Sequence, residues 1–156
     1  MIISVKKVND EAIIPMFAHP TDSGFDLFTC EEITVLGGKK SIAKTGLIFE
    51  LPLGWGIQIK NKSGITVKGV PTNSGNNADI TVFEGTVDMD YRGELGIMFK
   101  NEEEFEITIP KHTKLAQGVL RKVYNCTFNE VKEVNDTVRG EGGFGSTGTT
   151  VEIKGE

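Results

Sequence analysis

The chain has 156 residues, of which 38% are hydrophobic and 25% are charged, and its formal net charge is −5. This length fits one domain with one modest core, and the composition excludes a disordered chain. An acidic protein is a poor candidate for binding DNA or RNA, because that mode of binding needs a basic surface. A small anionic substrate remains possible, since it needs only a few local cations.

The compartment is predicted from the cysteines and the hydropathy. Cys30 and Cys126 form no CxxC pair, so they are expected to be thiols and not zinc ligands. No segment approaches the ~18 consecutive apolar residues of a membrane span, and no signal-like segment opens the chain. We therefore expect a cytoplasmic protein that binds neither a membrane nor nucleic acid.

Short β-type segments with a period near two recur along the chain, about ten residues apart. The clearest is Trp55 to Lys60, where Trp55, Ile57 and Ile59 alternate with polar residues. The segments cover residues 2–5, 33–36, 41–51, 55–60, 79–83, 95–99, 105–109 and 115–123. No segment carries a strong helical stripe. The pattern predicts an all-β protein, built as a sandwich, a jelly roll or a barrel.

Two stretches break this pattern. Residues 68–77 contain glycine, proline and three asparagines, which predicts a loop. Residues 137–150 are rich in glycine, serine and threonine, which is typical of a flexible segment. We therefore predict a β-barrel domain over residues 1–136 and a flexible C-terminal arm and tail over residues 137–156.

Two short polar clusters lie in the first half of the chain. In SGFDL, residues 23–27, a glycine permits a tight turn from which Asp26 projects a carboxylate. The alternative is a turn aspartate that caps its own backbone. In the second cluster Lys62, Ser63 and Gly64 offer a cation, a hydroxyl and a glycine amide, which together can hold a phosphate. An exposed strand end explains these three residues equally well.

The third cluster is GTVDMDYRGE, residues 85–94. Asp88 and Asp90 share a face if the backbone there stays extended. The alternative is a solvated charged turn, but that explains poorly why Gly85 and Gly93 bracket the charges.

The fourth cluster is RGEGGFGSTG, residues 139–148. Its glycines leave backbone amides free to approach a polyphosphate closely. Arg139 offers a fork of donors to a terminal phosphate, and Phe144 offers a surface on which a base can stack, worth ~1–3 kcal/mol. The cluster is not a Walker sequence, because no Gly-Lys-Ser/Thr follows a strand.

In their order and spacing, these clusters resemble the five motifs of the trimeric dUTPase family, with KLAQ at residues 114–117 as the remaining motif. The resemblance extends from Ser23 to Gly148. The chain departs from the family at Lys62, where the family usually has the arginine of Pro-Arg-Ser-Gly. It departs again at residues 112–114, which read HTK where Gly-Asp-Arg is usual. The interval between the second and third motifs is longer than usual, and residues 68–77 are expected to hold the extra length.

The resemblance implies a jelly-roll-like distorted β-barrel and a homotrimer whose active sites are shared between subunits. The implied reaction is the hydrolysis of dUTP to dUMP and pyrophosphate by attack of water on the α-phosphorus. This reaction limits uracil in DNA and supplies dUMP for dTMP synthesis. Mg²⁺ is the implied cofactor, held through water by Asp26, since this ion keeps several of its waters.

The resemblance also implies roles for individual residues. Asp88 activates the attacking water. Tyr91 packs under the deoxyribose and excludes a 2′-hydroxyl, and the backbone around Val87 and Gly96 reads the uracil edge. The remaining predicted substrate-binding residues are Lys62, Ser63, Gly64, Gln117 and Arg139 at the phosphates, Phe144 over the uracil, and Gly85 and Gly145.

Two other functions are alternatives to dUTP hydrolysis. A dCTP deaminase shares the fold, but such enzymes lack an arm with Arg139 and Phe144. A trimeric regulatory protein that kept only the fold is disfavoured by the presence of Asp88 and the arm. A second role with a regulatory protein partner stays open, and residues 68–77 are where we expect it.

Overall fold

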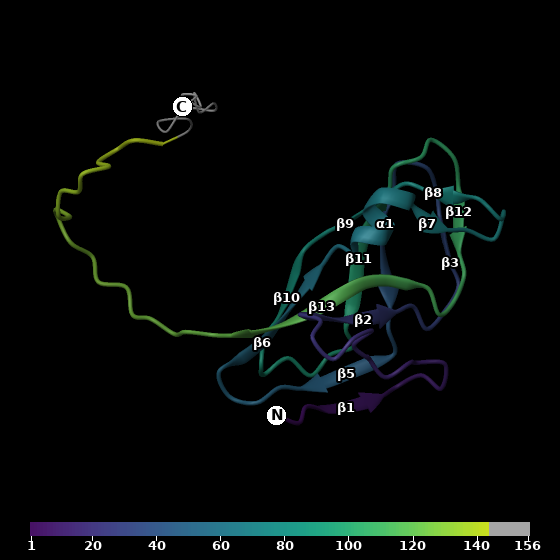
Figure 1. Cartoon of the computed structure of the whole chain (residues 1–156), viewed down its shortest axis with the longest axis horizontal. Coiled ribbons are helices and arrows are strands. Elements are labelled where there is room, and N and C mark those ends of the chain that lie inside the picture. The colour runs from purple at the N-terminus through teal and green to yellow at the C-terminus, as the bar shows by residue number, and fades with distance from the viewer. Residues whose placement is uncertain (144–156) are drawn as a thin grey trace, which may run out of the picture. The chain divides into compact units, whose positions relative to one another are not determined.

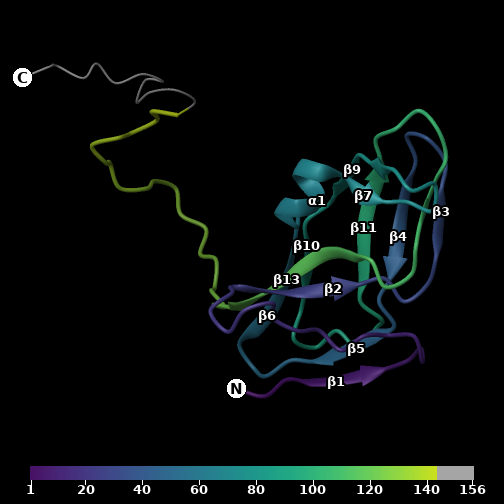
Figure 2. The ribbon, with the colours of Figure 1, turned by 45° about the vertical axis from the view of Figure 1, so that its right-hand side comes forward.

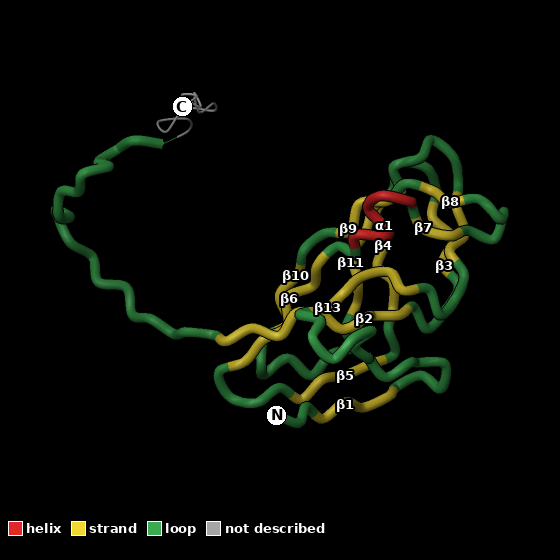
Figure 3. Tube along the Cα trace, viewed as in Figure 1, coloured by secondary structure: helices red, strands yellow, loops and turns green. Residues whose placement is uncertain are grey.

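A computed structural model describes residues 1–143 of the chain. Strands dominate this part, and it contains one short helix (Figure 3). The elements are β1 Ser4–Lys7, β2 Gly24–Phe28, β3 Ile33–Val35, β4 Lys40–Lys44, β5 Leu47–Glu50, β6 Trp55–Lys60, α1 Ser63–Lys68, β7 Val70–Pro71, β8 Asn77–Ala78, β9 Ile80–Val82, β10 Gly85–Val87, β11 Gly96–Asn101, β12 Ile107–Ile109 and β13 Lys114–Lys122. The predicted all-β, jelly-roll-like class is confirmed.

The chain divides into two units, which we describe separately. The first is a compact body, Met1–Tyr124, that holds every strand of the described part (Figure 1). The second begins at Asn125 and is described as far as Gly143, and over this range it is mostly irregular, with a few turns and bends. The domain boundary after residue 136 and the flexibility of the arm stay predictions. In residues 1–143, no helix has the length and apolar character needed to cross a membrane.

The body is built from antiparallel pairs only. The largest sheet has the order β10-β6-β13-β2, and its strands β6, β13 and β2 lie side by side in Figure 2. A second sheet has the order β4-β11-β9, and three two-stranded ladders join β1 to β5, β3 to β12 and β7 to β8.

The core lies between these sheets. Alternation along β11 buries Ile97 and Phe99 completely, whereas Met98 between them is 43% exposed. The prediction for the Trp55–Lys60 strand is confirmed, since Ile57 and Ile59 are buried. Fully buried large side chains elsewhere in the core are Leu27, Leu47, Leu95, Ile109 and Leu115.

The predicted β-segment over residues 41–51 is two strands and not one. β4 and β5 meet at Gly46, whose φ of +69° lies in the region that favours glycine. A Cβ built on Gly46 would lie 2.7 Å from the Cβ of Ala12, so the close packing there also requires glycine. The sequence shows the glycine, but the hydrophobic pattern runs through it without a break.

The prediction of a loop over residues 68–77 is wrong in part. Lys68 ends α1, and the remainder forms the β7–β8 hairpin around a turn in which Thr72 N–H donates to the carbonyl of Asn76 at 3.0 Å. Gly69, with φ of +78°, joins the helix to the hairpin. The helix could not be predicted from hydrophobic periodicity, because none of its residues is buried.

Gly118 of β13 allows the packing of the largest sheet to be tested. It pairs with Phe25 of β2, and a Cβ at this position would lie 2.4 Å from the Phe25 ring. We expect Gly118→Ala to lower the free energy of unfolding by about 1–3 kcal/mol, because the ring must shift in a packed core. Urea unfolding measures this. Adding Phe25→Leu removes the clashing ring edge, so the double variant should lose less than the sum of the two single losses; strict additivity would contradict the clash.

Candidate active site

A cavity of about 190 Å³ opens beside β10 and β11. Its lining includes Gly85, Val87, Asp88, Tyr91 and Gly96, five of the residues predicted to bind substrate or act in catalysis. Sequence reasoning missed the other lining residues, which are Ile59, Thr86, Glu94, Leu95 and Met98. Ligand pockets typically measure ~300–1,000 Å³, so this cavity suits one part of a ligand. We call it the β10 cavity.

A turn carries Asp88 to the β10 cavity. β10 ends at Val87, and Tyr91 N–H then donates to the carbonyl of Asp88 at 3.2 Å. The backbone is therefore not extended, and the condition under which Asp88 and Asp90 would share a face is not met. Asp88 lines the cavity and is exposed, whereas Asp90 is absent from the lining.

Close packing requires glycine at Gly93 but not at Gly85, the two residues that bracket the charged turn. Tyr91 folds back over Gly93, and a Cβ on Gly93 would lie 2.3 Å from the phenol oxygen. That oxygen donates to the carbonyl of Glu94 at 3.1 Å, which fixes the ring. A Cβ on Gly85 would meet only ordinary contacts at 3.7 Å from Ile59 and Met98, so packing alone does not require glycine there.

Arg92 and Glu94 hold this turn in place, although the sequence pattern predicts no role for either residue. Nη1 of Arg92 donates to the carbonyls of Met89 at 2.7 Å and Tyr91 at 3.1 Å. A carboxylate oxygen of Glu94 accepts from Gly46 N–H at 2.8 Å. Their charges mark them in the sequence, but the backbone groups they bind could not be predicted.

A second group of predicted residues gathers around Asp26 of β2. Nζ of Lys62 lies 2.7 Å from Oδ1 of Asp26, and Nζ of Lys114 lies 2.8 Å from Oδ2. Beside them Gln117 donates to the carbonyl of Asn61 at 2.8 Å. We call Asp26, Lys62, Lys114 and Gln117 the Asp26 cluster.

Asp26 is a strand residue and is only 4% exposed, so both the predicted turn and the alternative of a capping aspartate are wrong. Burial alone raises the pKa of this carboxyl, but the ammonium groups of Lys114 and Lys62 outweigh burial and lower the pKa below its ordinary value. The carboxylate form is therefore the one that the fold stabilises.

Ser63 and Gly64 are the first residues of α1 and are exposed. The alternative of a strand end is wrong. The first amides of a helix have no partner within the helix, so these two amides are free of intrahelical bonds. The structure thus places a cation and two free amides in succession at Lys62, Ser63 and Gly64.

The β10 cavity and the Asp26 cluster lie on opposite sides of the largest sheet. Gln117 pairs with both Asp26 and Lys60, so these three side chains share one face. Ile59 precedes Lys60 and therefore points to the other face, where it lines the cavity. None of the Asp26 cluster residues lines the cavity.

The predicted residues of the arm lie in the second unit. Nε of Arg139 donates to the carbonyl of Gly142 at 2.8 Å, and Gly140 N–H donates to the carbonyl of Thr137 at 3.0 Å, so the segment forms a local turn. Phe144 and Gly145 lie outside the described residues.

Comparison with known proteins settles the family. The dUTPase family model matches residues 10–148. The chain belongs to the dUTPase family. The deoxyuridine 5′-triphosphate nucleotidohydrolase of Clostridioides difficile is 40% identical over 94% of this chain and 97% of its own length. The enzyme of the same name from Nautilia profundicola is 38% identical over 95% and 99%.

Solved dUTPase structures share the fold. A variant of the Staphylococcus bacteriophage 80alpha dUTPase with dUpNHpp has a TM-score of 0.84 at 24% identity, covering 95% of this chain and 99% of that one. A variant dUTPase from phage phi11 of S. aureus, described with a structural Mg(II) ion, has a TM-score of 0.74 at 23% identity, covering 85% and 98%.

For this dUTPase family member, the role predicted for Asp26, holding magnesium through water, stays a prediction. Each carboxylate oxygen already contacts an ammonium group, and the side chain is buried. Within residues 1–143, no three acidic, histidine or cysteine side chains lie close enough together to hold a metal by themselves. A carboxylate oxygen can accept more than one hydrogen bond, and Oδ2 accepts none within the described residues, so Asp26 keeps the capacity to accept from a metal-bound water.

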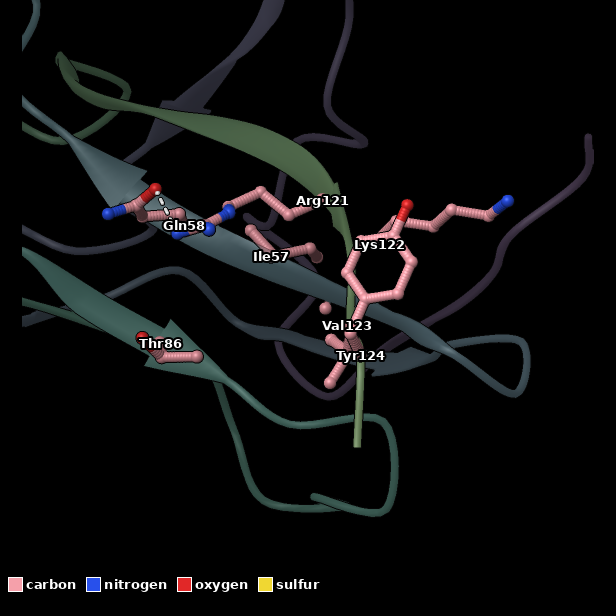
Figure 4. A pocket seen from close by; sticks show the side chains of 8 residues that line it. Ile57, Gln58, Thr86, Arg121, Lys122, Val123 and Tyr124 are labelled. Atoms are coloured by element: carbon pink, nitrogen blue, oxygen red, sulfur yellow. Dashed lines mark hydrogen bonds between the residues drawn. The ribbon is translucent and has the colours of Figure 1, made fainter. Parts of the chain in front are cut away.

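A further cavity, of about 310 Å³, lies where β6, β10 and β13 meet (Figure 4). Its lining includes Arg121, whose Nη1 donates to the Gln58 side chain at 3.0 Å, and Tyr124. The residues predicted for the dUTPase site are absent from this lining, so we do not assign the cavity to substrate.

The lowered pKa of Asp26 predicts how stability depends on pH. A carboxyl with a depressed folded-state pKa adds stability above its unfolded value, about 3.9, and this stability is lost as pH falls through the folded value. The gap in unfolding free energy between the wild type and Asp26→Asn should therefore be constant near neutrality and shrink below about pH 4. Urea unfolding at fixed protein concentration measures the gap; a gap that does not change with pH would contradict the ion-pair account.

Proposed function

We propose that this dUTPase family member hydrolyses dUTP to dUMP and pyrophosphate, which limits uracil in DNA and supplies dUMP for dTMP synthesis. The observation that carries the proposal is the turn of residues 88–94, which brings Asp88 and Tyr91 to the β10 cavity. Relatives that match nearly the whole chain bear the name of this activity.

The β10 cavity is proposed to hold the deoxyuridine part of the substrate. Val87 and Gly96 line it, and their backbone groups are proposed to offer an amide donor and carbonyl acceptors to the uracil edge. Tyr91, held by its bond to the Glu94 carbonyl, lies under the sugar in this proposal. A ring fixed in this way is proposed to exclude a 2′-hydroxyl by steric contact.

Asp88 is proposed to be the general base. Its exposed carboxylate lines the cavity and can accept a proton from a bound water. The water oxygen forms a bond to the α-phosphorus while the bond from that phosphorus to the bridging oxygen breaks. The bridging oxygen leaves with pyrophosphate, and the proton passes to Asp88.

The phosphates are proposed to bind at the Asp26 cluster and at the arm. Lys62 supplies a cation, Ser63 and Gly64 supply amides, and Gln117 supplies a side-chain amide. Arg139, Phe144 and Gly145 of the arm are proposed to add a guanidinium, an aromatic cover for the uracil and a further amide.

A complete site is proposed to need more than one copy of the chain. The β10 cavity and the Asp26 cluster face opposite sides of one sheet, so a substrate held in the cavity is directed away from the cations of the same chain. A homotrimer in which one subunit supplies the cavity and another the cluster resolves this. The arm then contributes to a site it shares with other subunits.

The proposal also covers the compartment and the cofactor. Cys30 and Cys126 are free thiols, which supports a reducing cytoplasm. Magnesium is proposed to enter with the triphosphate, whose charge it offsets, and to be held through water by Asp26, whose Oδ2 accepts no hydrogen bond within the described residues.

Incubation with single nucleotides tests the function. We expect the kcat/KM for dUTP to exceed those for dTTP, dCTP and UTP by roughly 10- to 200-fold or more, since one methyl or hydroxyl must be rejected by a small cavity. Pyrophosphate release measures it. Comparable turnover of dTTP or UTP would contradict the proposal, and ammonia release from dCTP would support the deaminase alternative.

Asp88→Asn tests the assigned base. The amide keeps the shape of the side chain but accepts no proton, so turnover should fall by roughly two to four orders of magnitude while nucleotide binding stays near that of the wild type. Asp90→Asn is the matched control, because Asp90 lies in the same turn but outside the cavity lining. If the two variants are equally active, another group activates the water.

A further inference from the structure

The residues that hold Tyr91 at the β10 cavity are bound to the connection between β4 and β5. The Tyr91 hydroxyl donates to the carbonyl of Glu94 at 3.1 Å. The carboxylate of Glu94 accepts from Gly46 N–H at 2.8 Å. The carbonyl of the next residue, Leu95, accepts from the hydroxyl of Thr45 at 2.7 Å. We call Thr45 and Gly46 the β4–β5 connection; it holds the two residues of the cavity lining that follow the turn.

The β4–β5 connection is itself fixed. Thr45 is completely buried, and its N–H also donates to the carbonyl of Leu95, at 3.3 Å. Gly46 has a φ of +69°, and its carbonyl accepts from Val8 N–H at 2.8 Å. In return, Leu95 N–H donates to the carbonyl of Leu47 at 2.8 Å. The end of the turn is therefore held by a part of the chain that cannot easily shift.

The hydroxyl of Thr45 is a group that core packing does not require. Valine has nearly the same shape, and a buried hydroxyl is tolerated only when it is hydrogen-bonded. A carbonyl oxygen has two lone pairs, and the amide of Thr45 already approaches the carbonyl of Leu95. The hydroxyl engages the same oxygen at a shorter distance and so fixes the backbone next to Glu94.

We propose that Thr45 and Glu94 are positioning residues for sugar selection, because together they fix the Glu94 carbonyl that holds Tyr91. This inference rests on the proposed function and deepens it. Tyr91 can exclude a 2′-hydroxyl only if its ring does not move aside when a ribonucleotide enters. Tyr91 is 47% exposed, so packing alone does not hold the ring, and the fixed carbonyl has to.

A loosened carbonyl affects the two nucleotides differently. dUTP carries no hydroxyl at the 2′ position, so a small displacement of the Tyr91 ring changes its fit little. UTP gains the room that its 2′-hydroxyl needs. The ratio of kcat/KM for dUTP to kcat/KM for UTP therefore falls. A general loss of folded enzyme lowers both values by the same factor and leaves the ratio unchanged.

The experiment measures kcat/KM for dUTP and for UTP by pyrophosphate release, at an enzyme concentration high enough to follow slow UTP turnover. We expect Thr45→Val, which removes only the hydroxyl bond, to lower the ratio about two- to tenfold, the value of one hydrogen bond. Thr45→Ser keeps the hydroxyl and should keep the wild-type ratio. Thr29→Val is the matched control, since Thr29 is equally buried, donates to the carbonyl of Pro110 at 3.2 Å and is absent from the cavity lining. Its ratio should equal that of the wild type.

A second pair of variants tests Glu94. Glu94→Gln keeps a side-chain oxygen that can accept from Gly46 N–H, whereas Glu94→Leu keeps none. The ratio should fall in Glu94→Leu and stay near the wild-type value in Glu94→Gln. Glu94 is only half-buried, so this pair decides the matter if circular dichroism shows that Thr45→Val does not fold.

Wild-type ratios in both Thr45→Val and Glu94→Leu would overturn the inference, and so would an equal fall in Thr45→Val and Thr29→Val. A fall in only one of the first two variants would overturn the role of the other residue. A wild type that hydrolyses dUTP and UTP equally well, or neither of them, would refute the proposed function and the role of both residues with it.

Discussion

The pairing of β13 with two neighbours fixes both the packing of the core and the geometry of the candidate site. β13 forms ladders with both β2 and β6, and one register places Gln117 beside Asp26 and Lys60. A slip of one residue would exchange the two faces of the strand and bring Gln117 into the core. Gly118 opposes such a slip, because only a residue without a side chain fits under the ring of Phe25. The register of β13 thus determines both how the core packs and where the cations of the Asp26 cluster lie.

The buried charge at Asp26 shows how stability and binding are related here. A buried ion pair is weak evidence for stability, since taking charges out of water costs about as much as their attraction returns. With two lysines on one carboxylate, the attraction prevails, and the pKa of Asp26 is lowered. The same arrangement leaves an excess positive charge near the surface. An acidic protein can in this way present a local cationic site to a highly anionic substrate.

Much of the fold and part of the site could be predicted, and the remainder depends on contacts that no local pattern records. Alternation around Ile57 and Ile59 predicted strand β6, because burial on one face repeats every second residue. Gly85 and Gly93 mark the turn in the sequence, yet only the structure shows that Gly93 makes room for Tyr91. The contact of Asp26 with Lys62 spans 36 positions, so the sequence could not pair them. Each motif can be recognised in the sequence by itself. Their placement on two faces of one sheet follows only from the register in which β13 pairs with β2 and β6.

The claim that a complete site needs two subunits is tested most directly by complementation. One variant carries Asp88→Asn, which removes the proposed base at the cavity, and the other carries Lys62→Met with Gln117→Ala, which removes cluster contacts. Each variant alone should be almost inactive. After co-expression, random mixed trimers should regain roughly one quarter of wild-type turnover, since that share of sites combines two intact halves. If mixing restores no activity beyond that of the separate variants, the cavity and the cluster of a single chain form the site together, and the account is contradicted.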